Sequence, residues 1–186
     1  SGGYENIITI GMGGERDSSM LGEEASLKEN IDLLKDIITE QRKLIRECVD
    51  NPDVPQMIAL YKEVEAYFYG NPGKRDGLRD WEGLDGVTFM LCEDNFGNMR
   101  TLLTEELRAR KGGWGMYYHF DYHGGSISYE WVNSSYLPKV WEQMTEAYEF
   151  GIRDIWIVNV GGLKFQEYPL RFFLELAYDY GKRGIG

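Results

Sequence analysis

The chain has 186 residues, of which 42% are hydrophobic and 14% aromatic, and its formal net charge is −11. This length and composition suit one well-buried globular domain or part of a larger one. The acidic excess argues against a nucleic-acid partner, because such binding needs clustered Lys and Arg to displace counterions from the phosphates. No segment is long and apolar enough to span a membrane, and no signal peptide is visible.

The chain is expected to form a single domain over residues 1–186, with a linker-like start at residues 1–3. Its two cysteines, Cys48 and Cys92, have no CxxC spacing and too few possible partner ligands for a metal site. Both are therefore predicted to be buried, reduced thiols. No metal and no cofactor is expected.

The first half of the chain begins with a predicted strand over 6–12, followed by a polar loop and a helix over 26–50. In that helix, Ser26 and Glu29 have the spacing of a capping box, and apolar residues recur on one face. The pattern predicts a second helix over 54–70, and the residues after it are rich in turn formers.

The second half alternates strands with helices. Strands are predicted over 87–94, 115–122 and 154–160, and helices over 104–113, 137–151 and 168–181. Near-continuous apolar strands separated by helices are typical of parallel β/α units, in which helices cover the sheet. The predicted fold class is therefore α/β.

Each predicted strand becomes polar where it ends. The carboxyl ends of parallel strands face the same side of such a fold, and ligands and catalytic groups gather there. The sequence therefore predicts a carboxylate-lined cleft. In chain order, the polar residues at or soon after the strand ends are Glu15, Asp17, Glu93, Asp94, Asn95, His119, Asp121, Asn159 and Glu167.

The segment GGWGMYYHFDYHGG, residues 112–125, contains the strongest single candidate, Asp121. Strand alternation places Tyr117, His119 and Asp121 on one side of the predicted strand. A carboxylate among aromatic rings is costly to bury unpaired, which favours a functional role such as that of a base. The alternative is that Asp121 caps the turn that follows.

The segment CEDNFGN, residues 92–98, has two interpretations of nearly equal weight. Asp94 or Asn95 would bind substrate hydroxyls, or the side chains would form an Asx turn around Gly97. Arg100 is suited to bidentate binding of a substrate carboxylate, but an ordinary surface arginine is the commoner case.

Glu167 precedes the last predicted helix and has Phe165 and Tyr168 close by in the sequence. An apolar setting would raise the pKa of its carboxyl into the range of a general acid. Alternatively, Glu167 only interacts favourably with the dipole of the helix that follows it. The sequence pattern leaves both open.

Motifs along nearly the whole chain resemble glycoside hydrolase family 115, the xylan α-1,2-glucuronidases. The resembling segments are TIGMGGERD (9–17), LLKDIITEQRKLI (33–45), ALYKEVEAYF (59–68), LCEDNFGNMRTL (91–102), RKGGWGMYYHFDYHGG (110–125), LPKVWEQMTEAYEFG (137–151) and IWIVNVGGLKFQEYPLRFF (155–173). Two positions depart from the family pattern. Gly13 stands where an arginine is usual, and Phe165 stands in LKF where LKP is usual.

The resemblance implies a (β/α)₈ barrel, of which four predicted strands are about half. It implies inverting hydrolysis that releases (4-O-methyl)glucuronic acid from glucuronoxylan, outside the cytoplasm of a bacterium, either secreted or periplasmic. Asp121 and Glu167 would be the catalytic carboxylates. The residues expected to bind substrate are Glu15, Asp94, Asn95, Arg100, His119, Tyr122 and Asn159.

Two other functions fit the sequence. The first is a non-catalytic, carbohydrate-binding part of a barrel. The second is a small flavodoxin-like domain that binds an anion, and its strand order would distinguish it from a barrel. An open half-barrel would also leave unpaired sheet edges, so a homodimer or the missing half of the barrel is expected to cover them.

Overall fold

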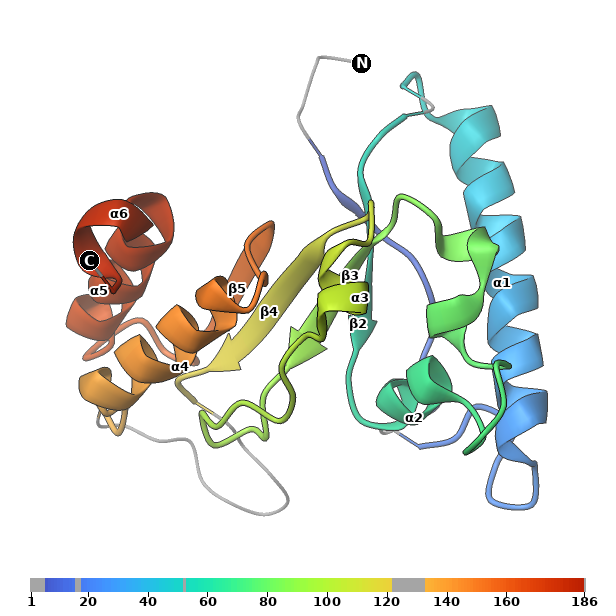
Figure 1. Cartoon of the computed structure of the whole chain (residues 1–186), viewed down its shortest axis with the longest axis horizontal. Coiled ribbons are helices and arrows are strands. Elements are labelled where there is room, and N and C mark those ends of the chain that lie inside the picture. Colours follow the sequence, from blue (N-terminus) through green and yellow to red (C-terminus); the bar gives the residue numbers. More distant parts are fainter. Residues whose placement is uncertain (1–5, 16–17, 52, 122–132, 186) are drawn as a thin grey trace. The chain divides into compact units, whose positions relative to one another are not determined.

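The structure is a computed structural model that describes residues 6–15, 18–51, 53–121 and 133–185. Its five strands follow one another in the sheet in chain order, β1-β2-β3-β4-β5 (Figure 1). The strands are β1 (Ile8–Thr9), β2 (Gln56–Leu60), β3 (Thr88–Cys92), β4 (Trp114–His119) and β5 (Ile155–Asn159). The helices are α1 (Leu27–Cys48), α2 (Glu63–Tyr69), α3 (Glu105–Arg108), α4 (Leu137–Glu149), α5 (Glu167–Tyr178) and α6 (Tyr180–Arg183), with 3₁₀ turns at Leu78–Asp80 and Glu82–Leu84.

This order confirms the predicted α/β class and is that of consecutive units in a (β/α)₈ barrel. It rules out the flavodoxin-like alternative, in which the first strand lies between the second and the third. The chain divides into two compact units, described separately below: Ser1–Met90 with Lys111–Gly113, and Leu91–Arg110 with Trp114–Gly186.

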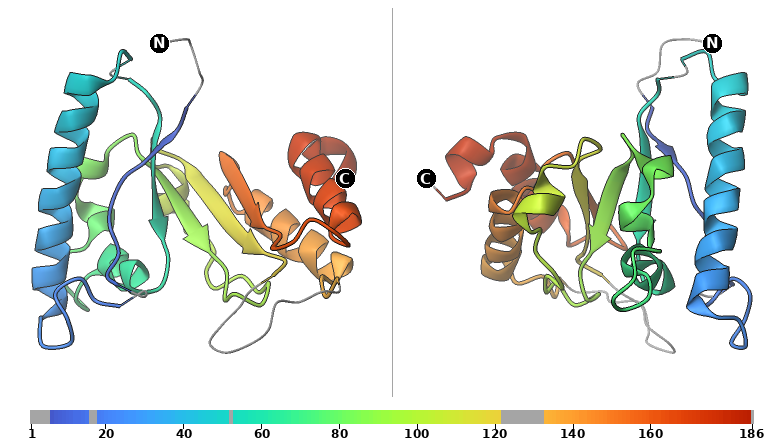
Figure 2. Two further views of the ribbon diagram at one scale, coloured as in Figure 1. Left: turned by 180° about the vertical axis from the view of Figure 1, so that it is seen from behind. Right: turned by 45° about the vertical axis from the view of Figure 1, so that its right-hand side comes forward.

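In the first unit, α1 begins with the predicted capping box. Ser26 Oγ accepts a hydrogen bond from Glu29 N, and the Glu29 carboxylate accepts one from Ser26 N at 2.8 Å. The helix buries Ile31, Leu34 and Ile38 on one face. It contacts α2 and the 82–84 turn, which lie beside it in Figure 2. Local capping and helical periodicity thus account for this helix.

The helix predicted over 54–70 is wrong in its first half, where the chain forms β2. Gln56, Ile58 and Leu60 are buried while the residues between them are half-buried, which is the two-residue period of a strand. β2 pairs in parallel with β1, and Lys62, with φ +50°, separates it from α2. A short apolar run fits both periods, so its strand partner decides the outcome.

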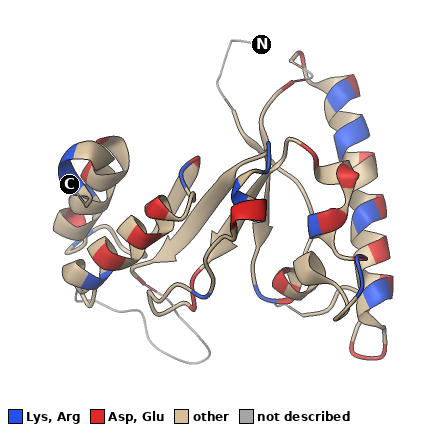
Figure 3. Ribbon diagram, viewed as in Figure 1, with Lys and Arg blue, Asp and Glu red and all other residues tan. Residues whose placement is uncertain are grey.

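In the second unit, β4 and β5 pair in parallel from Gly115 and Ile155 to His119 and Asn159, side by side in both views of Figure 2. Neither strand contains Lys, Arg, Asp or Glu, and these residues lie in the loops and helices (Figure 3). Phe173 of α5 is 1% exposed and its ring lies 5.9 Å, centroid to centroid, from that of Phe120. Helix α5 thus packs on one face of these strands.

The other face of β4 carries Tyr117 and His119, whose ring centroids are 4.5 Å apart. This confirms the predicted alternation, because Tyr118 and Phe120 instead contact Phe173 of α5. Both cysteines are free, and Cys92 is buried as expected. Cys48 is exposed, contrary to expectation, because it ends α1 outside the buried stripe. No helix among the described residues is long and apolar enough to cross a membrane.

Candidate active site

The site is built at the carboxyl end of β4, where Asp121 is 3% exposed. His119, the last residue of β4, is also buried, and the backbone of Phe120 donates a hydrogen bond to Asn159 O at 2.8 Å. The parallel ladder therefore brings three predicted site residues, His119, Asp121 and Asn159, to one edge of the sheet.

The turn after β5 lies directly against the Asp121 carboxylate. Asn159 Oδ1 accepts a hydrogen bond from Gly161 N at 3.0 Å, and Gly161 has φ +59°, which favours glycine. A Cβ at residue 161 would lie 1.8 Å from Asp121 Oδ2. Gly161 was not among the predicted site residues, although the glycine pair after a polar strand end was the signal for it.

Glu93 was predicted to line the cleft, but not to bind substrate or to pair with His119. Its Oε1 bonds Nδ1 of His119, and both side chains are almost fully buried. Its Oε2 accepts a hydrogen bond from Gly97 N at 2.6 Å. A single carboxylate thus joins β4 to the loop after β3. The signal was its position in the polar end of a strand, but sequence cannot show the partner.

Asp94 forms the Asx-type turn that was the structural alternative for this segment. Its carboxylate accepts hydrogen bonds from Phe96 N at 2.9 Å, Asn98 N at 3.0 Å and Asn98 Nδ2 at 2.6 Å. Partial burial alone would raise the pKa of this carboxyl, but the hydrogen bonds from Asn98 and Phe96 outweigh it and bring the pKa below its usual value.

The same loop is held to β4 and α4 by two further contacts. The Tyr118 hydroxyl donates to Gly97 O at 3.1 Å, and Lys139 Nζ donates to Phe96 O at 2.9 Å. Burial, assisted by nearby Glu93, raises the pKa of the Tyr118 phenol, so the group remains a donor at neutral pH. Asn95, with φ +71°, is therefore presented on a firmly anchored loop.

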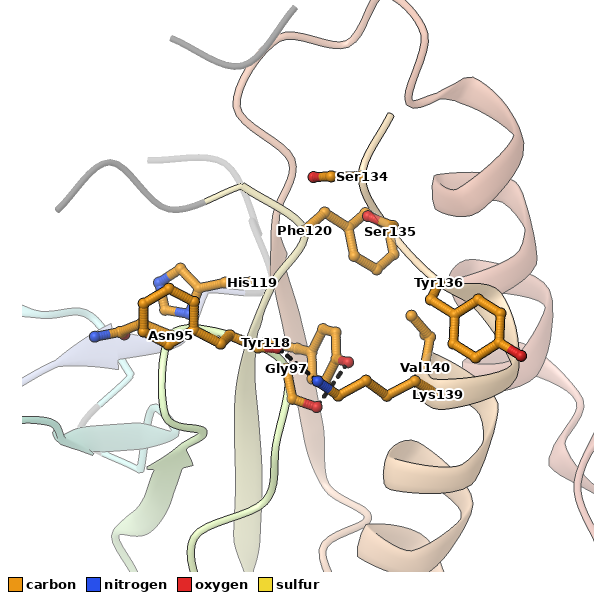
Figure 4. A pocket seen from close by; sticks show the side chains of 11 residues that line it. Asn95, Gly97, Tyr118, His119, Phe120, Ser134, Ser135, Tyr136, Lys139 and Val140 are labelled. Carbon is orange, nitrogen blue, oxygen red and sulfur yellow. Dashed lines mark hydrogen bonds between the residues drawn. The ribbon is translucent and has the colours of Figure 1, made fainter. Parts of the chain in front are cut away.

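A cavity of about 300 Å³ lies between this loop, β4 and the start of α4 (Figure 4). It offers amide, hydroxyl, imidazole and ammonium groups beside aromatic rings, a mixture suited to polar ligands such as sugars. The lining residues are Asn95, Phe96, Gly97, Tyr118, His119, Phe120, Ser134, Ser135, Tyr136, Lys139 and Val140.

Glu15 lies in the first unit, exposed, in the loop after β1. That loop is held by two residues that the sequence prediction missed. Gln41 accepts from Gly11 N at 2.7 Å and donates to Gly11 O at 3.2 Å, and Glu63 accepts from Gly14 N at 3.2 Å. These contacts join segments far apart in sequence, so local patterns do not reveal them.

Glu167 is exposed at the first residue of α5. Phe165 and Tyr168 are 55% and 70% exposed, so they do not give Glu167 the apolar surroundings on which a raised pKa was expected to depend. Glu167 instead borders a groove of about 840 Å³ along α5 and α6. The apolar part of that groove is Leu163, Leu170, Leu174 and Tyr178.

Of the remaining predicted residues, Arg100 is exposed between β3 and α3, and Tyr122 lies outside the described residues. The second unit thus brings Asp94, Asn95, His119, Asp121 and Asn159 to one edge, leaving Arg100 and Glu167 exposed. Across the described ranges, no cluster of three His, Cys, Asp or Glu residues is arranged to hold a metal ion.

Comparison with known proteins places this geometry in context. The sequence model of glycosyl hydrolase family 115 matches residues 1–184. A solved structure, that of a family GH115 4-O-methyl-alpha-glucuronidase with specificity for decorated arabinogalactans, is 35% identical to this chain and gives a TM-score of 0.79. The match covers 95% of this chain but 22% of that one, so the chain spans about a fifth of its solved relative. Curated protein sequences give no match.

Proposed function

The chain belongs to glycosyl hydrolase family 115, and on this premise we propose that it forms part of an inverting α-1,2-glucuronidase. The enzyme would release (4-O-methyl)glucuronic acid from the side chains of glucuronoxylan. Polymeric xylan cannot enter a cell, so we place the enzyme outside the cytoplasm, secreted or periplasmic in a bacterium.

The observation that carries the proposal is the burial of Asp121 at the end of β4, beside Asn159 and the His119–Glu93 pair. Inverting hydrolysis needs one carboxylic acid to protonate the leaving oxygen and one carboxylate to activate water. We assign this pair to Asp121 and Glu167. The burial of Asp121 supports its assignment as a catalytic carboxylate, whereas Glu167 is assigned on its family motif alone.

We propose that the sugar is bound by the side chains near Asp121 and in the preceding loops. Asn95, His119 and Asn159 offer hydrogen bonds at the edge where Asp121 lies, and Lys139 lines the adjoining cavity. Glu15, Asp94, Arg100 and Tyr122 are assigned to the substrate site by resemblance only.

The test is hydrolysis of a glucuronic-acid-decorated xylo-oligosaccharide, followed by proton NMR. In the complete enzyme, Asp121→Asn and Glu167→Gln are each expected to reduce kcat by at least roughly a thousandfold with an unchanged melting temperature. Asp36→Asn, an exposed position on α1, is the control and keeps its activity. Near wild-type turnover of either amide variant would contradict its assignment, and first release of the α-anomer would contradict inversion.

A decorated arabinogalactan is the second candidate substrate, because the solved relative is described as specific for it. Comparing kcat/KM on the two oligosaccharides decides between them. The isolated 186-residue chain could instead only bind carbohydrate. In that case NMR of this chain would show ligand-induced shifts without sugar release, and activity would need the remainder of a barrel or a second copy.

A further inference from the structure

We propose that Glu93 is a positioning residue that acts through His119. It keeps a proton on Nδ1 of His119, so that Nε2 is the imidazole nitrogen left to act on a sugar bound in the cavity that His119 lines. The catalytic consequence rests on the proposed glucuronidase function, but the position of the proton does not. Nothing in the sequence prediction gave Glu93 this role.

The two side chains form an almost completely buried pair, with 0% of the Glu93 side chain and 4% of the His119 side chain exposed. Glu93 has two acceptor oxygens, and each has a donor: His119 Nδ1 for Oε1 and Gly97 N for Oε2. A buried carboxylate needs such partners, because burying it without them is strongly unfavourable. Each oxygen of the Glu93 carboxylate therefore has one hydrogen-bond donor of its own.

An ionised carboxylate can only accept hydrogen bonds. The nitrogen bonded to it must carry a proton, whether the imidazole is neutral or cationic. Any proton that His119 exchanges or shares with substrate then passes through Nε2. In known carboxylate–histidine pairs, the partner in this way fixes the tautomer and the ring orientation.

Glutamine cannot replace Glu93 in this arrangement, because it offers one acceptor oxygen and one donor NH₂ group to two donors. In Glu93→Gln, the amide oxygen can still accept from Gly97 N, but the NH₂ group then meets Nδ1 of His119 as a donor, which requires the reversed tautomer with the proton on Nε2. The opposite amide orientation is unfavourable, because it would point the NH₂ group at the N–H donor of Gly97. Glu93→Asp retains the charge and both acceptors on a shorter side chain, so it serves as the conservative variant.

The position of the proton can be measured on this chain, because it contains only two histidines, His119 and His123. Imidazole ¹⁵N spectra, assigned with a His123→Gln variant, are expected to show Nδ1 of His119 protonated throughout the range of about pH 5 to 8. Glu93→Asp should preserve that pattern and Glu93→Gln should change it. A wild-type Nε2–H tautomer, or an unchanged pattern in Glu93→Gln, would overturn the proposal.

The kinetic test uses the complete enzyme and the decorated xylo-oligosaccharide. Glu93→Gln should reduce kcat/KM by roughly ten- to a hundredfold. When His119 is already replaced by Ala, the same Glu93→Gln change should alter kcat/KM by less than about twofold, because Glu93 acts through His119. Thr145→Val, which removes an equally buried hydroxyl within α4, is the control. The proposal would be overturned if the effects of Glu93→Gln and His119→Ala on kcat/KM multiply as independent effects do. It would also be overturned if Glu93→Gln lowers kcat/KM no more than Thr145→Val does.

The two hypotheses fail in different ways. A wild-type enzyme that releases no uronic acid contradicts the proposed function, and the imidazole spectra then decide the role of Glu93 alone. An active wild type with kinetically independent Glu93 and His119 contradicts only the positioning role.

Discussion

The backbone of Gly161 lies so close to Asp121 that a Cβ at residue 161 would come within 1.8 Å of Oδ2. The turn after β5 therefore packs directly against the carboxylate that follows β4. Gly161 also has φ +59°, a conformation that other residues adopt only with strain. Absence of a side chain at this position is thus a condition for the observed place of Asp121.

Gly161→Ala is expected to reduce kcat roughly a hundredfold, because misplacing a catalytic group by about 1 Å has an effect of that size. The control is Gly73→Ala, where φ is +75° but nothing lies within 4 Å of the added Cβ. Backbone strain of about 1 kcal/mol applies to both variants, whereas loss of turnover should occur only at Gly161. Equal activity of the two variants would argue against a role for this contact.

Asp94→Asn tests the loop after β3 through the pH dependence of stability. The folded-state pKa of Asp94 is lowered, so its carboxylate stabilises the protein fully above about pH 4, the unfolded-state value, and this contribution is lost as pH falls through the lower folded-state pKa. At pH 7 the variant should be less stable by less than about 1 kcal/mol, since the site is largely solvated.

Urea unfolding of the wild type and Asp94→Asn at several pH values measures this difference. It should shrink as the pH falls below about 4. In the wild type, Asn98→Ala should remove part of the same stabilisation, because its amide donates to Asp94 Oδ2 at 2.6 Å. A difference that grows on acidification would be the wrong sign and would reject this account.

Tyr118→Phe tests the anchor between β4 and this loop. The variant leaves Gly97 O without the hydroxyl that donates to it at 3.1 Å, and losing a buried partner costs about 1–3 kcal/mol. Urea unfolding measures the loss. Tyr178→Phe, on a side chain that is 94% exposed, should cost close to nothing. Equal stability of the two variants would mean that this hydroxyl contributes nothing to the fold.

We predict that the isolated chain self-associates through the apolar groove along α5 and α6. Association would remove the exposed leucines of the groove from water, which is favourable. Leu174→Lys should shift the chain toward monomer in sedimentation equilibrium. Leu44→Lys is the matched control, because Leu44 is equally exposed, 55% against 53%, but belongs to α1 and is not one of the residues that line the groove. A wild-type chain that is monomeric at high concentration would contradict the prediction.

The sequence alone determined the features that depend on local physics. Capping and periodicity located α1, apolar runs located β3, β4 and β5, and alternation assigned Tyr117 and His119 to one face. Strand ends rich in carboxylates indicated the edge where the candidate site lies. These patterns are readable because neighbouring residues alone impose them.

Only the tertiary structure decided the features that depend on distant partners. Residues 56–60 form a strand because they lie between β1 and β3 in the sheet, and β1 pairs with the first two of them. Glu167 is exposed although its sequence neighbours are aromatic. Glu93 meets His119 across 26 positions, and Gly161 meets Asp121 across the β4–β5 pair. A side chain's hydrogen-bond partner and its burial are set by what packs against it, and a linear pattern does not contain that information.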